Sequence, residues 1–320
     1  MKIVVITGCM GLIGSYVTRK CIQKGWMVYG IDKFTYAANQ ESYDEFMQYE
    51  NFSFVEEDIA TLKSIPDCDY IINVAAESHV GNSIIDSTDF IESNVVGVKN
   101  LLDIIRIKPK NIDNPPIFFH FSTDEVYGDI TTGEHIETDI LKPSNPYSAS
   151  KAAADMFVLA WARTYDMKYI IFRPTNNYGI GQYCEKLIPL SVKLLSIGRK
   201  INLHDEGKPV RTWLHAEDTA NSVIQIIKSG KINQIYNVAG NTELINHETA
   251  SKIVRVYHGL EESGPTEDDQ YFNLQRKRRG QDVRYSLDDS KLKKLGWKPT
   301  KIFDEEIESI VAYYKQNFRW

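Results

Sequence analysis

Two adjacent carboxylates, Asp124 and Glu125, closely follow a short apolar run that ends at Phe121. The run, IFFHF, has the composition of a buried strand, so the two acids are expected where that strand leaves the core. Like charges this close repel each other and are costly to desolvate. A solvated turn is one explanation for the pair. The other is that the two groups serve one reaction, as an acid and a base.

The second explanation requires a particular backbone geometry. Successive side chains of a strand point to opposite faces of the sheet, so adjacent acids share a pocket only where regular strand geometry has ended. We therefore predict a turn or a first helical turn over 123–126. In a dry pocket the two carboxyl groups cannot both ionise cheaply, so their pKa values should split into those of an acid and a base.

A tyrosine and a lysine stand four residues apart in the stretch PYSASK, at Tyr147 and Lys151. On a helix this spacing places both side chains on one face. Because tyrosine ordinarily titrates near about 10, Tyr147 needs a nearby cation to act as a base at neutral pH. An exposed helix face that happens to carry both side chains is the alternative.

Three glycines, Gly8, Gly11 and Gly14, follow the first apolar run with the spacing GxxGxxG. Such a turn lets the backbone approach a pyrophosphate, and the helix that follows offers unpaired N–H groups. Asp32 ends the next apolar run, where a carboxylate can bind the adenosine ribose and repels a 2′-phosphate. The pattern predicts an NAD site, with an ordinary strand–helix turn as the alternative.

Two later strand ends are expected to complete the cofactor site. Asp58 and Ile59 follow the third apolar run and can flank an adenine ring, although an aspartate at a strand end is common. The fourth run ends in NVAA, whose Ala75 and Ala76 are small enough for a cofactor to approach closely.

The segments that must position these groups alternate between apolar runs and amphipathic stretches. Strands are expected over 2–8, 27–32, 52–58, 68–76, 116–122 and 167–174. Helices are expected over 12–26, 89–106 and 145–165, with little helix in 58–70. Strands that are apolar on both faces and alternate with helices indicate an α/β fold, with a doubly wound parallel sheet of the Rossmann type.

After about residue 175 the alternation loosens, which suggests a second, smaller lobe interleaved with the sheet. Helices are expected over 187–200, 217–230 and 303–320, and a strand over 234–240. The last helix has apolar spacing at Ile307, Ile310 and Val311. We predict a Rossmann domain of residues 1–175 plus about 213–240, and a substrate-binding lobe of residues 176–212 and 241–320.

The composition is that of a soluble globular protein. Of 320 residues, 42% are hydrophobic and 25% charged, and the net charge of −6 argues against a nucleic acid or an acidic membrane as partner. No apolar run approaches the length of a membrane span, and a strand at residues 3–7 does not resemble a secretory leader. The four cysteines lack metal-ligand spacing. We therefore expect a cytoplasmic protein without a metal site.

Taken together, these motifs resemble the nucleotide-sugar 4,6-dehydratases of the extended short-chain dehydrogenase/reductase superfamily, above all the dTDP-glucose 4,6-dehydratase family. The resemblance runs nearly end to end. The matching stretches are TGCMGLIGS, DKFTYAAN, AAESHV, STDEVYG, NPYSASKAAAD, RPTNNYG, EKLIP, VRTWLHAEDTA, YNVAG and RYSLDDSKLKKLGWKP. The Asp-Glu pair is the discriminating feature, because related epimerases and decarboxylases usually lack it.

The resemblance implies a reaction in which water leaves a nucleotide-linked glucose and a 4-keto-6-deoxy sugar remains. Tyr147 would take the C4 hydroxyl proton while the C4 hydride passes to NAD⁺ and later returns to C6. Glu125 would remove the C5 proton, and a protonated Asp124 would protonate the departing C6 hydroxyl. Thr123 would hydrogen-bond near the C4 oxygen. Lys151 would hold the nicotinamide ribose and lower the pKa of Tyr147.

The resemblance also implies two sets of binding residues. The NAD set is Gly8, Gly11, Leu12, Ile13, Gly14, Asp32, Lys33, Thr35, Asp58, Ile59, Ala75, Ala76, Tyr147 and Lys151. The set for the nucleotide-diphosphate sugar is His79, Thr123, Asn176, Glu185, Lys186, Leu187, Arg211, Asn246 and Arg278. Arginine suits the diphosphate because its fork pairs with phosphate oxygens. Gly81 and Gln281 depart from the family's usual aspartate and histidine.

Several alternatives remain open from the sequence. UDP-glucose is the nearest alternative substrate, and a 4-epimerase or decarboxylase is the nearest alternative enzyme. A catalytically idle nucleotide-binding protein is a third possibility, which the intact set of five catalytic candidates disfavours. Family members are commonly homodimers built through helices beside the Tyr–Lys helix, so the stretch FVLAWARTY at 157–165 is the expected dimer face.

Overall fold

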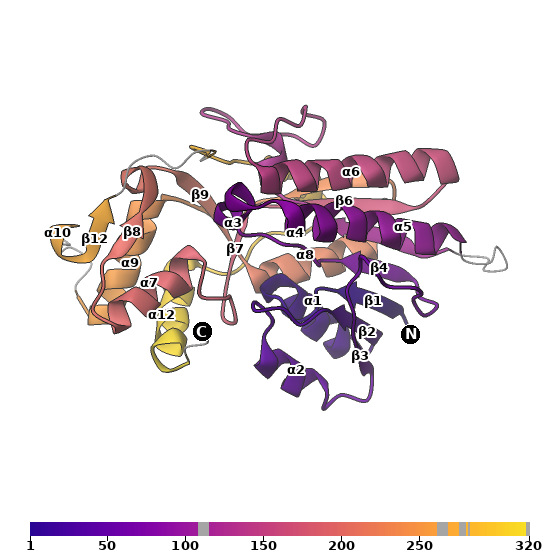
Figure 1. The fold of residues 1–320 in the computed structure, drawn as a ribbon, viewed down its shortest axis with the longest axis horizontal. Coiled ribbons are helices and arrows are strands. Elements are labelled where there is room, and N and C mark those ends of the chain that lie inside the picture. Colours follow the sequence, from indigo (N-terminus) through magenta and orange to yellow (C-terminus); the bar gives the residue numbers. More distant parts are fainter. Residues whose placement is uncertain (108–114, 261–267, 275–279, 281, 318–320) are drawn as a thin grey trace.

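The computed structural model describes residues 1–107, 115–260, 268–274, 280 and 282–317. At its centre lies a seven-stranded sheet whose strands all run parallel (Figure 1). In spatial order the strands are β10 (Gln234–Val238), β6 (Tyr169–Pro174), β5 (Ile117–Phe121), β4 (Tyr70–Asn73), β1 (Ile3–Thr7), β2 (Met27–Asp32) and β3 (Phe52–Glu56). This order confirms the predicted doubly wound sheet. The winding direction reverses between β1 and β4, and such a switch point opens a crevice at the carboxyl ends of the strands.

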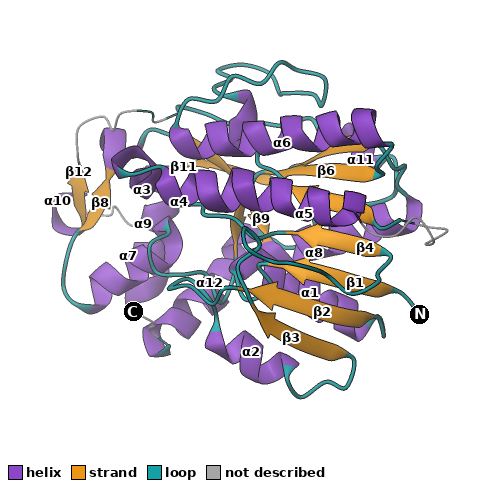
Figure 2. Cartoon of the chain, turned by 45° about the vertical axis from the view of Figure 1, so that its right-hand side comes forward, coloured by secondary structure: helices purple, strands orange, loops and turns teal. Residues whose placement is uncertain are grey.

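Helices cover both faces of the sheet. On one face α1 (Leu12–Gln23) packs with α8 (Ala216–Ser229), and on the other α5 (Gly97–Ile107) lies beside α6 (Pro146–Tyr165) (Figure 2). Because side chains alternate along a strand, β1 sends Val4 to the first face and Val5 to the second. Each face thus has its own apolar core.

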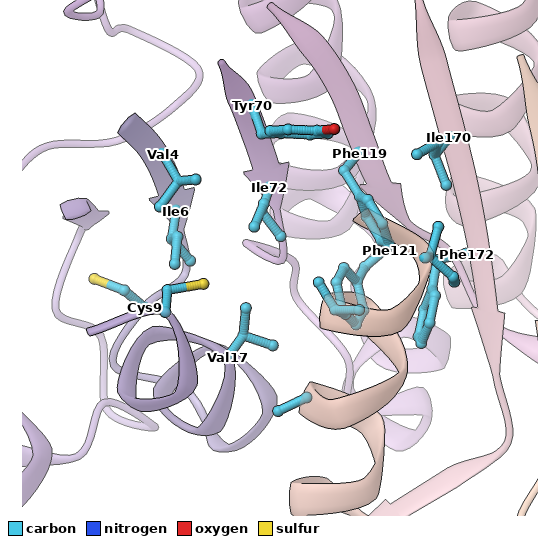
Figure 3. Packing of buried hydrophobic residues seen from close by; sticks show 14 of the residues in the cluster. Val4, Ile6, Cys9, Val17, Tyr70, Ile72, Phe119, Phe121, Ile170 and Phe172 are labelled. Carbon is cyan, nitrogen blue, oxygen red and sulfur yellow. The ribbon is translucent and has the colours of Figure 1, made fainter. Parts of the chain in front are cut away.

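The core on the α1 face is rich in aromatic rings (Figure 3). Val17 of α1 packs there with Ile72 of β4, while Phe121 and Phe172 meet between β5 and β6 with ring centroids 4.5 Å apart. This packing fixes the end of β5, directly before the carboxylate pair.

Short helices follow several of the strands. They are α2 (Gln40–Phe46), α3 (Val80–Ile85), α4 (Thr88–Ile91) and the 3₁₀ turn η2 (Asp124–Tyr127). The π-helical turn η1 (Glu92–Val96) joins α4 to α5, so the helix expected over 89–106 is one helical stretch with a wider turn inside it. The segment 59–69, which is fully described, contains no helix, as predicted.

A second group of elements forms a lobe beside the sheet, at the left in Figure 1. Its strands form two small sheets, β11 (Thr242–Ile245) with β9 (Val210–His215) and β7 (Asn176–Tyr178), and β12 (Phe272–Leu274) with β8 (Ile201–Leu203). Its helices are η3 (His204–Gly207), α7 (Leu187–Ser196), α9 (Asn246–His258), α10 (Asp268–Tyr271) and α12 (Phe303–Gln316). The short helix α11 (Ser290–Lys293) packs against β10 instead.

The lobe has its own core, in which α7, α9 and α12 pack together. Ile307, Ile310 and Val311 of α12 are buried there, as their spacing predicts. Among the helices that the structure describes, none combines the length and apolar composition that crossing a membrane requires.

Candidate active site

A cleft of about 460 Å³ lies at the carboxyl ends of the parallel strands and extends to residues of the lobe. It brings together nearly all of the residues that the sequence singled out. Those that line it are Gly8, Gly11, Leu12, Ile13, Gly14, Asp32, Lys33, Thr35, Asp58, Ile59, Ala75, Ala76, His79, Thr123, Asp124, Glu125, Tyr147, Lys151, Asn176, Glu185, Lys186, Leu187 and Arg211.

One predicted substrate contact does not line the cleft, and another lies outside the described residues. Asn246 is not among the lining residues. It is the first residue of α9, and its backbone N–H donates to the carbonyl of Pro209, 2.9 Å away. Arg278 lies outside the described residues, as does Gln281. A role for these positions in substrate binding stays a prediction.

The glycine loop leaves no room for side chains at two of its three glycines. A Cβ on Gly14 would lie 1.9 Å from the carbonyl oxygen of Gly8, and a Cβ on Gly8 would lie 2.6 Å from the backbone of Ala75. Gly8 also has φ +68°, a conformation that favours glycine. In the described part of the chain no side chain caps α1, and the residues of its first turn line the cleft, so its N–H groups can form a cradle for a phosphate.

Asp32 is held rigidly at the end of β2. One carboxylate oxygen accepts the backbone N–H of Met10 and the other accepts that of Phe34, each at 2.9 Å. Each oxygen retains a further lone pair that can accept a hydrogen bond from a ribose hydroxyl. The glycine cradle and this fixed carboxylate fit an adenine dinucleotide that has no 2′-phosphate on its adenosine ribose.

The carboxylate pair leaves strand geometry at the predicted place. Thr123 caps the 3₁₀ turn η2, and its hydroxyl accepts the N–H of Glu125 at 3.3 Å while donating to Asp124 Oδ1 at 3.0 Å. The other oxygen, Asp124 Oδ2, is buried and has no hydrogen-bond partner among the described residues. Burial, followed by the charge of Glu125, raises the pKa of Asp124 to about 7.

Glu125 stands in a more polar environment than its neighbour. Its Oε2 accepts from Asn145 Nδ2 and from the Tyr285 hydroxyl, both at 3.3 Å. Burial raises the pKa of Glu125 too, but the Arg211 cation and the Asn145 hydrogen bond oppose the rise. Of the two carboxyl groups, Asp124 is therefore the better placed to hold a proton and Glu125 the better placed to accept one.

Helix α6 presents Tyr147 and Lys151 to the same cleft. A capping box at Asn145 and a proline at the helix start fix its first turn. Lys151 Nζ donates to the carbonyl of Phe121, 2.6 Å away, and burial lowers the pKa of this lysine to about 8. In the protein alone, the pKa of Tyr147 is not lowered as we expected. Burial raises the pKa of this phenol, and the charges of Glu125 and Asp124 add to the rise.

Two cations approach the carboxylates from the lobe side. Lys186 Nζ donates to the carbonyl of Ser78 at 3.0 Å and pairs with Glu185 at 3.5 Å. The Arg211 guanidinium lies over the ring of Tyr285, 4.7 Å from its centroid. Both cations can therefore reach an anionic group bound in the cleft.

Among the lining residues that sequence reasoning missed, Asn145 and Tyr285 hydrogen-bond to Glu125, and Asp282 contacts Tyr285. Asn145 had a signal, since an asparagine before a proline that opens a helix is a typical N-cap. Asp282 and Tyr285 had none in their local sequence. They reach Glu125 because the chain pairs Val210 of β9 with residues 283 and 284.

Comparison with known proteins identifies relatives over the full length. The family model described as GDP-mannose 4,6 dehydratase matches residues 5–310. A dTDP-glucose 4,6-dehydratase of Haemophilus influenzae is 37% identical, with 99% of each chain covered. The crystal structure of a dTDP-glucose 4,6-dehydratase of Streptomyces venezuelae with NAD bound superposes with a TM-score of 0.87 at 33% identity, covering 98% of this chain and 97% of that one.

The fold alone does not separate reaction classes. A UDP-glucuronic acid 4-epimerase of Bacillus cereus also has a TM-score of 0.87, at 20% identity, covering 98% of this chain and 99% of that one. What distinguishes one reaction from another must therefore lie in the side chains of the site.

Proposed function

Because this chain belongs to the GDP-mannose 4,6 dehydratase family, we propose that it removes water from dTDP-glucose and forms the 4-keto-6-deoxy sugar. It is a hydro-lyase, like the dTDP-glucose 4,6-dehydratases that are 36–37% identical over its whole length, and it uses NAD, which solved structures of such dehydratases contain. The observation that carries the proposal is the pair Asp124 and Glu125 on one 3₁₀ turn, in the cleft that also holds Tyr147. A reaction that moves only a hydride needs no such pair.

The residues that would hold NAD are those of the glycine cradle and Asp32, with Lys151 near the nicotinamide ribose. When bound, NAD supplies the hydride acceptor that allows oxidation at C4 and the hydride donor that allows reduction at C6. Burial raises the pKa of Tyr147, and the positive charge of a bound nicotinamide would oppose that rise by favouring the phenolate.

The protein's own groups then move the protons. Tyr147 accepts the proton of the C4 hydroxyl. The ketone formed at C4 acidifies the C5 hydrogen, and Glu125 removes it as the general base. Asp124, kept neutral by burial and by the charge beside it, gives its proton to the C6 hydroxyl, which leaves as water.

The lobe residues bind the rest of the substrate in this proposal. Arg211 holds the diphosphate, and Lys186 with Glu185 holds the sugar beside the carboxylate pair. The sheet domain of residues 1–175 plus about 213–240 carries the cofactor, and the lobe of residues 176–212 and 241–320 carries the nucleotide sugar.

We further propose that the enzyme is a cytoplasmic homodimer. Apolar side chains are exposed on α4, η1, α5 and α6, which pack against one another. They are Ile91 of α4, Val96 of η1, Ile107 of α5, and Met156 and Tyr165 of α6. A second copy placed around a two-fold axis would cover this face, which includes the segment 157–165. The buried free thiols of Cys9 and Cys21 support a reducing compartment.

Turnover measured separately with dTDP-, UDP-, CDP- and GDP-glucose tests the proposed reaction. With dTDP-glucose we expect the highest kcat/KM and a product that mass spectrometry finds lighter by one water, without net release of NADH. A product of unchanged mass with galactose configuration would instead identify an epimerase. A preference for UDP-glucose would support the proposed dehydration but would show that the nucleotide of the substrate is UDP.

A further inference from the structure

A chain of hydrogen-bonding groups leads from Glu125 to the protein surface. Glu125 Oε2 lies 3.3 Å from the Tyr285 hydroxyl, and that hydroxyl forms a very short contact with Asp282 Oδ2. The same Asp282 oxygen forms a very short contact with the hydroxyl of Ser144. Every consecutive pair of groups in this series is thus within hydrogen-bond distance.

The middle and the outer end of the series lie in different environments. Tyr285 and Asp282 are each 3% exposed, whereas Ser144 is exposed and is not among the residues that line the cleft. The series therefore runs along the wall of the cleft through Glu125, Tyr285 and Asp282 and reaches solvent at Ser144, outside the cleft lining.

The middle of the series has more acceptors than donors. Tyr285 has one hydroxyl proton and faces a carboxylate on either side, so it can donate to Glu125 or to Asp282 but not to both. When Asp282 is protonated, it can donate a hydrogen bond to the Tyr285 oxygen while the Tyr285 hydroxyl donates to Glu125. When Asp282 is ionised, the Tyr285 hydroxyl donates its hydrogen bond to Asp282 instead of to Glu125. Burial raises the pKa of Asp282, which brings these two arrangements closer in free energy.

In the proposed reaction this series can move protons to and from Glu125, and the inference rests on that proposed function. Glu125 becomes a neutral acid when it takes the proton from C5, and C5 regains a proton when the hydride reaches C6. We propose that Tyr285, Asp282 and Ser144 form a relay that exchanges the proton on Glu125 with solvent between these two events.

The transfer balances in protons and charge. Protonated Glu125 gives its proton to the Tyr285 oxygen, while the Tyr285 hydroxyl gives its own proton to Asp282. Asp282 then passes a proton to water through Ser144. The reverse sequence brings a solvent proton to Glu125 for delivery to C5. Tyr285 and Asp282 act through Glu125 and touch no reacting carbon, so they are positioning and relay residues.

Turnover in D₂O tests the relay, with deuterium at C5 of the product measured by mass spectrometry and NMR. The wild type should place deuterium at C5. Tyr285→Phe removes only the hydroxyl and keeps the ring under Arg211, so it should still form product, with C5 exchange slowed roughly tenfold or more. Asp282→Asn should act in the same direction. Tyr236→Phe is the matched control, since among the described residues its hydroxyl hydrogen-bonds to the backbone of Lys231, and Tyr236 does not line the cleft.

The possible outcomes of this experiment separate the relay from the proposed dehydration. No C5 deuterium in wild-type product, or equal deuterium in wild type and Tyr285→Phe, would overturn the relay while leaving the dehydration intact. If Tyr285→Phe stops turnover with NADH bound, the hydroxyl positions Glu125 for C5 deprotonation instead of exchanging its proton, and the relay is wrong. If it stops turnover before NADH forms, the hydroxyl serves an earlier step and the relay is wrong. Absence of dehydrated product from the wild type would refute the proposed function itself.

Discussion

At the scale of the residue, the site depends on two carboxyl groups that are chemically alike and differently surrounded. Asp124 has a buried oxygen that lacks a partner in the described structure, whereas Glu125 receives hydrogen bonds from Asn145 and Tyr285. Arg211 further favours the ionised form of Glu125. Repulsion between the two carboxyl groups and their unequal surroundings thus favour a protonated Asp124 beside an ionised Glu125 at the same pH.

The first prediction concerns the order of the steps. Glu125→Gln cannot remove the C5 proton, so we expect oxidation at C4 to proceed and then stall, with turnover lower by about 10²- to 10⁴-fold. Bound NADH should accumulate, and its absorbance can be followed after rapid mixing with substrate. Tyr147→Phe is the contrasting variant, because it blocks the first proton transfer and should form no NADH. Wild-type turnover in either variant would remove the role assigned to that residue.

The second prediction concerns stability against pH. Folding raises the pKa of Asp124 from its ordinary 3.8 to about 7. A raised pKa means that the fold favours the protonated form, so this stabilisation is complete at low pH and is lost as pH rises to about 7. Relative to Asp124→Asn, the wild type should lose about 1.4 kcal/mol for each pKa unit of this shift. Urea unfolding at a series of pH values measures it, and a difference independent of pH would contradict the assignment.

At the scale of the element, the site is made by the ends of strands and the starts of helices. The sequence predicted the central strands well, because runs of Ile, Val and Phe that are buried on both faces leave a clear pattern. It also predicted a turn or a first helical turn over 123–126, from the geometric need of two adjacent acids to face one pocket, and the structure has the 3₁₀ turn η2 at Asp124–Tyr127.

The lobe was harder to predict, for a physical reason. Its β9 pairs with β7 and β11, both of which are short, so the local pattern of VRTWLH carries little information about its partners. The same strand brings Asp282 and Tyr285 beside Glu125. Contacts that depend on such long-range pairing cannot be read from residue spacing.

The third prediction tests the glycine loop as an element. Replacing a helical glycine by alanine usually stabilises a helix by up to about 1 kcal/mol. In Gly14→Ala the new Cβ would meet the Gly8 carbonyl oxygen at 1.9 Å, so we expect destabilisation by about 1–3 kcal/mol or more instead. Gly11→Ala is the matched control, because its Cβ would lie at an ordinary 3.5 Å from that oxygen. Denaturant unfolding compares the two, and equal stabilities would show that the loop relaxes freely.

At the scale of the whole molecule, two units with separate cores meet around one cleft. The sheet has an apolar core on each face, and the lobe has a third between α7, α9 and α12. This division places the glycine cradle on the sheet and Arg211 and Lys186 on the lobe. Bound nucleotide sugar would therefore touch both units at once.

The fourth prediction concerns assembly. Met156 is 49% exposed on α6, within the proposed dimer face. A buried charge at that position would be costly, so Met156→Glu should convert a dimer into monomers in sedimentation experiments. Ile197→Glu is the control, since Ile197 is 54% exposed in the lobe, and it should remain dimeric. A wild-type protein that sediments as a monomer would refute the proposed dimer.

In the proposed reaction, one enzyme-bound hydride leaves C4 and returns to C6 of the same sugar. Turnover of dTDP-glucose deuterated at C4, followed by NMR of the product, measures this transfer. We expect the deuterium to appear in the C6 methyl group and water to be lost. Deuterium that returns to C4 with inverted configuration would contradict it, because Asp124 and Glu125 would then have no part in the reaction.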